Sequence, residues 1–333
     1  MTNIKNQVLI LGITGGIGSE VARQLLEQNW NVIALHRSPE LVSKEINLKT
    51  KHITWIKGDA MNSEDVLRAA EGCCVIVHAV NPPGYKKWEK FVIPMIKNSI
   101  NAAKKQRATV VFPGSIYNYG PDVLPNDVLP NISESTPQHP ITKKGSLRAE
   151  MEQELKRFAN DGGSVILIRA GDFYGPYAKN NWFSQGLINP NKAVKSIYNP
   201  SSKNVGHQWA YLPDVAQTMI SMIKKRHELE PYAVYHMKGI WDPDGTLMVN
   251  TIQKIIHEKS GKKPKIAPFP WWLVWLAALF NTTAKELLEM KYLWAQPIKM
   301  ENNKLRKKLG EEPHTPIEIA VEKTLRSLGA LND

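Results

Sequence analysis

The stretch that most constrains the fold is "QVLILGITGGIG", residues 7–18, near the start of the chain. An apolar run leads into three glycines spaced three residues apart, and a helical pattern follows over residues 17–28. In a strand–turn–helix unit, the first glycine permits a tight turn, the second lets the backbone approach a pyrophosphate, and the third lets helix and strand pack closely. The free N–H groups of the helix N-terminus then bind phosphate. We therefore predict a dinucleotide-binding turn, with a purely structural turn as the alternative. Its binding residues are Gly12, Thr14, Gly15, Gly16, Ile17 and Gly18.

Further along the chain, short apolar runs alternate with helical patterns. The predicted strands are 31–36, 52–57, 74–79, 109–114 and 164–169, and the predicted helices are 62–71, 86–105 and 143–160. Continuous apolar runs of this length are typical of parallel strands that are buried on both faces. The alternation implies right-handed crossovers, so the predicted fold is α/β, a doubly wound parallel sheet of the Rossmann type.

The pattern changes after Arg169. Residues 175–206 are rich in Gly, Pro and Asn, a helix over 213–226 and a strand over 233–238 return to the sheet, and the chain from Trp241 onward is mostly helical. We predict a dinucleotide-binding domain formed by residues 1–175 plus 206–239. A smaller, mostly helical substrate-binding domain is expected over residues 176–205 plus 240–333.

The end of the second strand indicates which dinucleotide binds. An acid there would bind the ribose 2′-hydroxyl of NAD, whereas a basic residue accommodates the 2′-phosphate of NADP. The sequence "ALHRSPE" has no acid at the strand end, and Arg37 and Ser38 follow His36. We predict NADP(H), with Arg37 as the phosphate partner, Ser38 as a further coenzyme-binding residue, and NAD(H) as the alternative coenzyme. A solvated loop arginine is the other interpretation of Arg37.

Two further strand ends carry polar residues. Asp59 in "KGDAMN" follows the third strand, where a carboxylate can accept from the adenine amino group. The N-cap of the next helix is better placed at Asn62 or Ser63. His78 lies inside an apolar strand, so we interpret it as a hydrogen-bonded core residue.

Composition limits the partners. The chain has 333 residues, 42% of them hydrophobic and 22% charged, as in a soluble globular protein. The apolar run over 271–280 is shorter than the ~20 residues that a spanning helix needs, so we predict no membrane span. The net charge is +12, but the lysines and arginines are spread along the chain and do not alternate with aromatic residues, as a single-strand binder would need. We therefore predict no nucleic-acid partner.

Cysteine usage and the N-terminus indicate a cytoplasmic protein. The two cysteines, Cys73 and Cys74, are adjacent, which suits neither a disulfide framework nor a metal site. The N-terminal apolar run continues into the glycine turn without a small-residue cleavage site, so we interpret it as a strand rather than a signal peptide.

These motifs resemble the extended short-chain dehydrogenase/reductase family, of the NAD-dependent epimerase/dehydratase type, over residues 7–238. The matching segments are "GITGGIG", "GDA", "VIVHAVNPP", "FPGSIYNYGP", "IRAGDFYGP" and "HQWAYLPDVAQTM". The resemblance implies an oxidoreductase or epimerase-like enzyme acting on a small carbonyl or hydroxyl substrate, with a homodimer as a candidate assembly. The resemblance also implies five further coenzyme-binding residues: Ala60, Ala79, Val80, Asn81 and Ala170.

The resemblance departs from the family at the catalytic residues, which are normally Ser or Thr, Tyr and Lys. Ser115 stands at the serine position, but Lys144 stands at the tyrosine position and Arg148 at the lysine position. A shifted alignment would offer Thr142 and Ser146 instead, and neither supplies the tyrosine.

Lys144 is a candidate for the proton-transfer role of the missing tyrosine. It lies one helical turn from Arg148, and a neighbouring cation together with burial would lower the pKa of its ammonium group. A lysine perturbed in this way acts as an acid or base, and Arg148 would hold the ribose or a substrate anion. The alternative is that both cations pair with Glu150, Glu152 or Glu154 on a solvated helix.

Three further residues are candidates for substrate binding: Tyr117, Asp172 and His207, all on segments near the carboxyl edge of the sheet. His207 stands where the family has arginine, which argues against a nucleotide-sugar diphosphate. A non-catalytic NADP(H)-binding sensor or regulatory protein is the second functional interpretation.

An aromatic cluster marks the C-terminal part: Trp271, Trp272, Trp275, Phe280, Tyr292 and Trp294. The favoured interpretation is that these residues pack the small domain against the sheet. The alternatives are an apolar substrate pocket and an exposed patch for a second subunit or a membrane surface, of which membrane binding is not expected.

Overall fold

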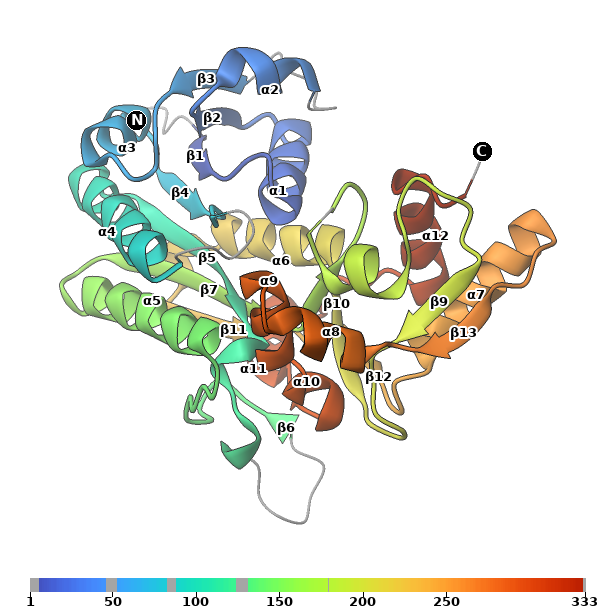
Figure 1. Cartoon of the computed structure of the whole chain (residues 1–333). Coiled ribbons are helices and arrows are strands. Elements are labelled where there is room, and N and C mark those ends of the chain that lie inside the picture. The colour runs from blue at the N-terminus through green and yellow to red at the C-terminus, as the bar shows by residue number, and fades with distance from the viewer. Residues whose placement is uncertain (1–5, 46–52, 83–87, 124–130, 179, 332–333) are drawn as a thin grey trace.

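The protein is built around a seven-stranded parallel sheet (Figure 1). The computed structural model describes residues 6–45, 53–82, 88–123, 131–178 and 180–331. In order across the sheet, the strands are β11 (Tyr232–His236), β7 (Ser164–Ala170), β5 (Thr109–Ser115), β4 (Val75–His78), β1 (Gln7–Leu11), β2 (Asn31–His36) and β3 (Ile53–Lys57). Every pairing in this sheet is parallel, so the predicted doubly wound fold is confirmed.

Helices cover both faces of the sheet. One face carries α1 (Gly16–Glu27) and α6 (Leu212–Lys224), and the other carries α3 (Ser63–Ala69), α4 (Trp88–Gln106) and α5 (Lys143–Asn160). Alternate residues of β1 pack into two different clusters, with Val8 on the α1 side and Leu9 on the α4 side. Burial on both faces explains why the strands read as continuous apolar runs.

The predicted elements of the sheet domain are all present, with small shifts at their ends. Residue 52 of the third predicted strand and residues 86–87 of the predicted helix 86–105 lie outside the described residues. Helix α2 (Pro39–Glu45) was not predicted, and it begins with proline, whose fixed φ suits the first helical position.

The rest of the chain mixes helices with short strands. The helices are α7 (Leu247–Ser260), α8 (Trp271–Ala278), α9 (Thr282–Glu289), α10 (Tyr292–Ala295), α11 (Asn303–Leu309) and α12 (Ile317–Ser327). Among the short strands, β10 (His207–Tyr211) pairs with β8 (Asp172–Tyr174) on one side and β12 (Ile240–Asp242) on the other. The other two pairs are β9 (Ser196–Asn199) with β13 (Lys265–Pro268), and β6 (Asn131–Ile132) with β14 (Lys299–Met300). The predicted helical character therefore holds, and the short strands are an addition to it.

The aromatic cluster divides between core and surface. Trp294 is buried, and Trp271 and Tyr292 pack against the same hydrophobic cluster. The prediction of packing is wrong for Trp272, Trp275 and Phe280, which are exposed.

Two other predictions concern the cysteines and the membrane. Among the described residues, neither Cys73 nor Cys74 forms a disulfide, and burial raises the pKa of the Cys73 thiol to about 11. Within the described ranges, no helix combines the length and apolar character that crossing a bilayer requires.

A buried ion pair fixes α5 against the sheet. Arg169 of β7 and Glu152 of α5 are both almost fully buried, and their closest nitrogen and oxygen atoms are 2.6 Å apart. Arg169 also donates to the hydroxyl of Tyr119 at 2.7 Å. Because Glu152 is engaged with the sheet, α5 presents its first turns in a fixed orientation at the carboxyl edge of the strands.

Candidate active site

A cavity of about 1040 Å³ runs along the carboxyl edge of the sheet. Its lining joins the glycine turn after β1, the ends of β2, β4 and β5, the first turns of α5, and the segment after β7. In a doubly wound sheet this edge is where ligands bind.

The glycine turn has no room for side chains at two positions. Gly12 has a φ of +87°, and a Cβ atom there would lie 2.6 Å from the carbonyl oxygen of Ala79. A Cβ atom at Gly18 would lie 2.2 Å from the carbonyl oxygen of Gly12, so the turn and α1 touch at this point. The N-cap residue of α1 is Gly15, which has no side chain to accept from the first-turn N–H groups. This arrangement fits a phosphate group at the helix N-terminus.

Five of the six predicted turn residues line the cavity. These are Gly12, Thr14, Gly15, Gly16 and Ile17. Gly18 does not line the cavity, but its lack of a side chain lets α1 contact the turn at Gly12.

The end of β2 brings Arg37 to the cavity. Arg37 is exposed and lines the cavity beside His36. The backbone N–H of Ser38 donates to Nδ1 of His36 at 3.0 Å, and Ser38 does not line the cavity. An exposed arginine at this edge of the cavity is available to a phosphate group.

Asp59 and Ala60 line the cavity after β3. Oδ1 of Asp59 accepts from the N–H of Met61 at 3.0 Å. Asn62 accepts from the N–H groups of Glu64 and Asp65, which confirms the predicted helix cap and separates that role from Asp59.

The segment after β4 also contributes. Ala79, Val80 and Asn81 line the cavity, whereas Ala170 at the end of β7 is fully buried and does not. His78 is buried, its Nδ1 lies 2.8 Å from the hydroxyl of Ser99, and burial lowers its pKa to about 3. The interpretation of His78 as a hydrogen-bonded core residue is confirmed.

Lys144 lines the same cavity from the first turn of α5. It is only 5% exposed, and its Nζ lies 3.5 Å from Oε2 of Glu286 on α9. Burial lowers the pKa of Lys144 below its ordinary value, and the carboxylates of Glu286, Glu289 and Asp172 oppose this shift. The predicted lowering of this pKa by burial is confirmed, whereas Arg148, the other expected cause, is not among its main causes.

Arg148 lies one turn further along α5. Its guanidinium carbon is 5.6 Å from the ring centre of Trp88 and 5.5 Å from that of Phe112, and Nη1 donates to the carbonyl of Pro113 at 3.3 Å. With its amide oxygen turned toward Arg148, Asn81 accepts from Nη2 at 3.2 Å. These contacts hold the cation at the cavity wall.

The alternative of two solvated cations paired along α5 is wrong. Lys144 is buried and pairs with Glu286, which is outside α5. Glu152 pairs with Arg169, and Glu154 pairs with Arg157 and Lys97.

The shifted alignment receives no support from the geometry. Thr142 is the N-cap of α5, and its hydroxyl accepts from the N–H of Gly145 at 3.0 Å. The hydroxyl of Ser146 donates to the carbonyl of Thr142 at 3.0 Å. Neither residue lines the cavity, whereas Lys144 and Arg148 both do.

A hydrogen-bonded chain connects three predicted substrate residues. The hydroxyl of Tyr117 donates to Oδ1 of Asp172 at 2.6 Å, and Nε2 of His207 lies 2.9 Å from Oδ2 of the same carboxylate. Ser115 ends β5, and its hydroxyl accepts from the N–H of Tyr117 at 3.2 Å. Ser115, Tyr117 and Asp172 line the cavity together with Lys144.

His207 does not line the cavity. Its ring stacks on that of Trp294 with 3.6 Å between ring centres and an interplanar angle of 5°. His207 therefore contacts a residue that lines the cavity, Asp172, without lining the cavity itself.

Several residues of the site were not predicted. Glu286, the partner of Lys144, and the apolar wall lie in segments without a clear sequence period. The wall residues are Trp182, Phe269, Leu287 and Met290. Trp182 precedes a short π-helix (Phe183–Leu187). Such helices are frequent at functional sites, but this one has no pattern in the sequence by which it could be predicted.

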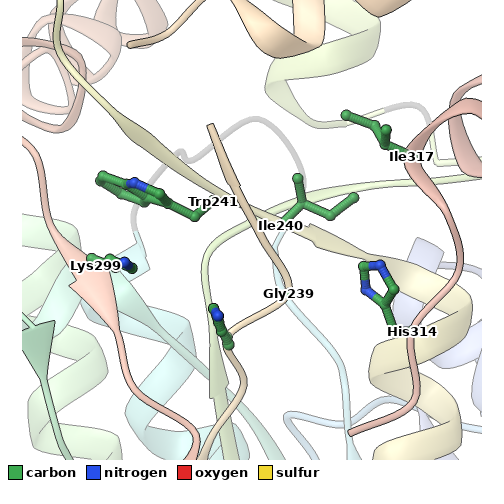
Figure 2. A pocket seen from close by; sticks show the side chains of 7 residues that line it. Gly239, Ile240, Trp241, Lys299, His314 and Ile317 are labelled. Atoms are coloured by element: carbon green, nitrogen blue, oxygen red, sulfur yellow. The ribbon is translucent and has the colours of Figure 1, made fainter. Parts of the chain in front are cut away.

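A second cavity, of about 390 Å³, is separate from the first and shares no lining residue with it. Figure 2 shows Trp241 and Lys299 on one side of Gly239 and Ile240, with His314 and Ile317 on the other. It is open, and none of the predicted site residues lies there.

Among the described residues, no group of three or more His, Cys, Asp and Glu side chains is arranged to hold a metal ion.

Comparison with known sequences identifies a family. The profile of the "NAD dependent epimerase/dehydratase family" matches residues 8–237. A curated protein from Synechocystis sp., described as "Putative dihydroflavonol 4-reductase", is 24% identical over 175 residues, which make up 50% of this chain and 49% of that relative. The match thus spans about half the length of that relative.

Comparison with solved structures covers nearly the whole chain. MoeE5 in complex with UDP-glucose and NAD superposes with a TM-score of 0.71 at 18% identity, over 96% of this chain and 98% of that one. A UDP-galactose 4-epimerase gives 0.68 at 20% identity, over 97% and 98%. The UDP-glucuronic acid 4-epimerase from Bacillus cereus gives 0.70 at 15% identity, over 97% and 98%. At these identities, the likeness establishes the fold.

Proposed function

Because this chain belongs to the NAD-dependent epimerase/dehydratase family, we propose that it is an NADP(H)-dependent oxidoreductase or epimerase-like enzyme in which Lys144 replaces the usual tyrosine. The family assignment confirms the resemblance that the sequence motifs indicated. The observation that carries the proposal is the position of Lys144, which is buried, has a lowered pKa, and lines the same cavity as the glycine turn and Ser115.

The coenzyme would lie along the cavity. The turn from Gly12 to Ile17 would hold its pyrophosphate, Asp59 its adenine, and Arg37 its 2′-phosphate. The fit is supported by the closely packed glycines, where a side chain would fill the space that the turn needs. When bound, NADPH supplies a hydride to a substrate carbonyl carbon.

Lys144 and Ser115 would act on the substrate oxygen. In the reduction, the Lys144 ammonium donates a proton to the carbonyl oxygen while that oxygen accepts from the hydroxyl of Ser115, and the product is an alcohol beside a neutral amine. Arg148 would bind the ribose or a substrate anion. Tyr117 and Asp172 would contact the substrate, and His207 would position Asp172.

We also propose that residues 176–205 plus 240–333 form the substrate-binding part. Its support is the apolar wall of the cavity, which comes from these segments through Trp182, Phe269, Leu287 and Met290. The wall favours a carbonyl or hydroxyl substrate with an apolar body. The absence of an arginine at His207 argues against a nucleotide-sugar diphosphate.

The test of this function is oxidation of NADPH across a panel of aldehydes and ketones that differ in apolar size. We expect turnover with a subset that carries apolar substituents. Tight NADPH binding without turnover across the panel would favour the second candidate, a coenzyme-binding sensor. The observation that supports this candidate is the ion pair between Lys144 and Glu286, because it engages the proposed acid.

The pH dependence of reduction depends on Glu286. The protonated amine is the acid, so kcat/KM should fall as the pH rises through the pKa of Lys144, which lies below the ordinary 10.5 because of burial. Glu286 raises that pKa, so Glu286→Gln should move the fall to lower pH. Profiles of kcat/KM against pH for both proteins measure the shift. Glu289 raises the pKa of Lys144 less than Glu286 does, so Glu289→Gln should shift the fall in kcat/KM by a smaller amount. If the fall in Glu286→Gln stays at the wild-type pH or moves to higher pH, Lys144 is not the acid.

Coenzyme preference depends on Arg37. We expect Arg37→Ser to raise the Kd for NADPH by about 10- to 100-fold, because a charge-assisted hydrogen bond to the 2′-phosphate is lost. NADH lacks that phosphate and serves as the control, so its Kd should remain unchanged. Calorimetric titration of both coenzymes measures the two effects, and equal losses for NADPH and NADH would show that Arg37 does not read the phosphate.

A further inference from the structure

Helix α8 and the two residues after it carry an exposed apolar surface. We call it the apolar ridge, and its members are Trp272, Leu273, Trp275, Leu276, Leu279 and Phe280. Trp272 is 65% exposed, Trp275 60% and Phe280 93%. Isolated exposed apolar side chains are ordinary, but a contiguous group of this size marks an interaction surface.

The ridge is exposed on more than one side of its helix. Trp272, Leu276 and Leu279 follow helical spacing along one side, whereas Leu273 and Phe280, seven residues apart, follow another. All eight residues of α8 are apolar, so it has no polar face turned to water. Figure 1 shows α8 and α9 next to each other, and the two helices pack together.

Five exposed lysines precede or follow the ridge in the sequence. They are Lys262, Lys263, Lys265, Lys285 and Lys291. Lys291 lies with its Nζ 5.7 Å from the ring centre of Trp271, at the base of α8.

The acids of α9 are directed away from the ridge, toward α5. Glu286 pairs with Lys144, and Glu289 accepts from the backbone N–H of Lys143 at 3.1 Å. The acids of α9 therefore have partners on α5, while Lys285 of α9 and Lys291 are exposed next to α8, in a chain whose net charge is +12.

We propose that the apolar ridge and its lysines dock on the surface of an anionic lipid bilayer. Tryptophan and phenylalanine partition into the interface between headgroups and acyl chains, and lysines beside them are attracted to anionic headgroups. The helix lies in the interface and does not span the bilayer, in agreement with its eight residues.

Charge complementarity favours a bilayer over a second copy of this chain. A symmetric pairing through the ridge would bring the lysines of both copies together, and like charges repel. A bilayer also encloses a protruding helix on several sides, whereas a flat protein interface covers one side.

None of the ridge residues lines the large cavity, but residues near the ridge in the chain do. Phe269, just before α8, and Leu287 and Met290, in and after α9, line that cavity. The docking itself does not depend on the proposed reaction, because it concerns the outer surface of α8.

The experiment is co-sedimentation of the full chain, without coenzyme, with vesicles of phosphatidylcholine mixed with phosphatidylglycerol and with vesicles of phosphatidylcholine alone. We expect binding to the mixed vesicles, weakened by salt and by omission of the anionic lipid. Trp272→Ser/Trp275→Ser/Phe280→Ser should lower the partition coefficient on the order of 100-fold. The matched control is Ile319→Ser on α12, which changes an exposed apolar residue outside the ridge and should bind as the wild type does.

A second variant tests the charges without changing the apolar surface. Lys285→Glu/Lys291→Glu should weaken binding to the mixed vesicles, whereas Lys224→Glu on α6 should not. Circular dichroism of each variant verifies that the chain remains folded. Two results would overturn the proposal: wild-type protein that stays in the supernatant with anionic vesicles, or a wild-type dimer in sedimentation velocity that the triple serine variant converts to a monomer without any vesicle binding.

Discussion

Replacing Lys144 with methionine is expected to lower the rate of NADPH-dependent carbonyl reduction by about 10²–10⁴-fold, with little change in the Kd for NADPH. Methionine keeps the apolar stem of the lysine in its buried site but cannot donate a proton. Lys144 lines the cavity from the start of α5, and the glycine turn lines it after β1. Under the proposed function, the loss should therefore fall on kcat rather than on coenzyme binding. Single-turnover oxidation of NADPH measures the chemical step, and calorimetry measures the Kd.

The neighbouring lysine provides a matched control. Lys143 is exposed and pairs with Glu89 at the surface at 2.7 Å, so Lys143→Met removes a cation from the same helical turn without touching the cavity. Its rate should stay within about twofold of wild type, because surface ion pairs contribute little. Equal rates for wild type and Lys144→Met on a substrate that turns over would remove Lys144 from the mechanism and leave Tyr117 as the next acid to test.

Breaking the buried ion pair between α5 and β7 is expected to be the most destabilising single change. Glu152→Ala leaves the Arg169 guanidinium buried without its carboxylate, which should lower the free energy of unfolding by about 3–5 kcal/mol. The double variant Glu152→Met/Arg169→Met removes both charges, so no unpaired charge remains buried. Its free energy of unfolding should therefore fall by less than that of Glu152→Ala. Urea denaturation, followed by circular dichroism, measures the free energy of unfolding of the wild type, the single variant and the double variant.

Glu150 is the control for this second prediction. It is exposed on the same helix, so Glu150→Ala should change the free energy of unfolding by no more than about 0.5 kcal/mol. A loss in Glu152→Ala as small as that of the control would mean that the pair does not hold α5 in place. The orientation of Lys144 would then need another explanation.

The sheet could be predicted because its signals are local. Most strands of the sheet are short apolar runs buried on two faces, as Val8 and Leu9 of β1 illustrate, whereas the edge strand β3 is only partly buried. The turn after β1 requires glycine at Gly12 and Gly18 for steric reasons. Such signals need only neighbouring residues. The spacing that placed Lys144 and Arg148 on one face of α5 was local as well.

The remaining features depend on contacts between distant segments. Glu286 meets Lys144 only because α9 folds over the start of α5, and no spacing in the sequence reveals that pair. The stacking of His207 on Trp294 likewise joins β10 to α10. The exposure of Trp272 and Phe280 was unexpected because an apolar helix in a globular chain normally indicates a core element.

The most direct test of the central claim is calorimetric titration of the purified chain with NADPH, NADP⁺, NADH and NAD⁺. The claim is that backbone amides after β1 hold the pyrophosphate of a nicotinamide dinucleotide in the cavity that Lys144 lines. We predict saturable binding at one site per chain, tighter for the phosphorylated coenzymes. Absence of binding for all four, in protein shown to be folded, would contradict it.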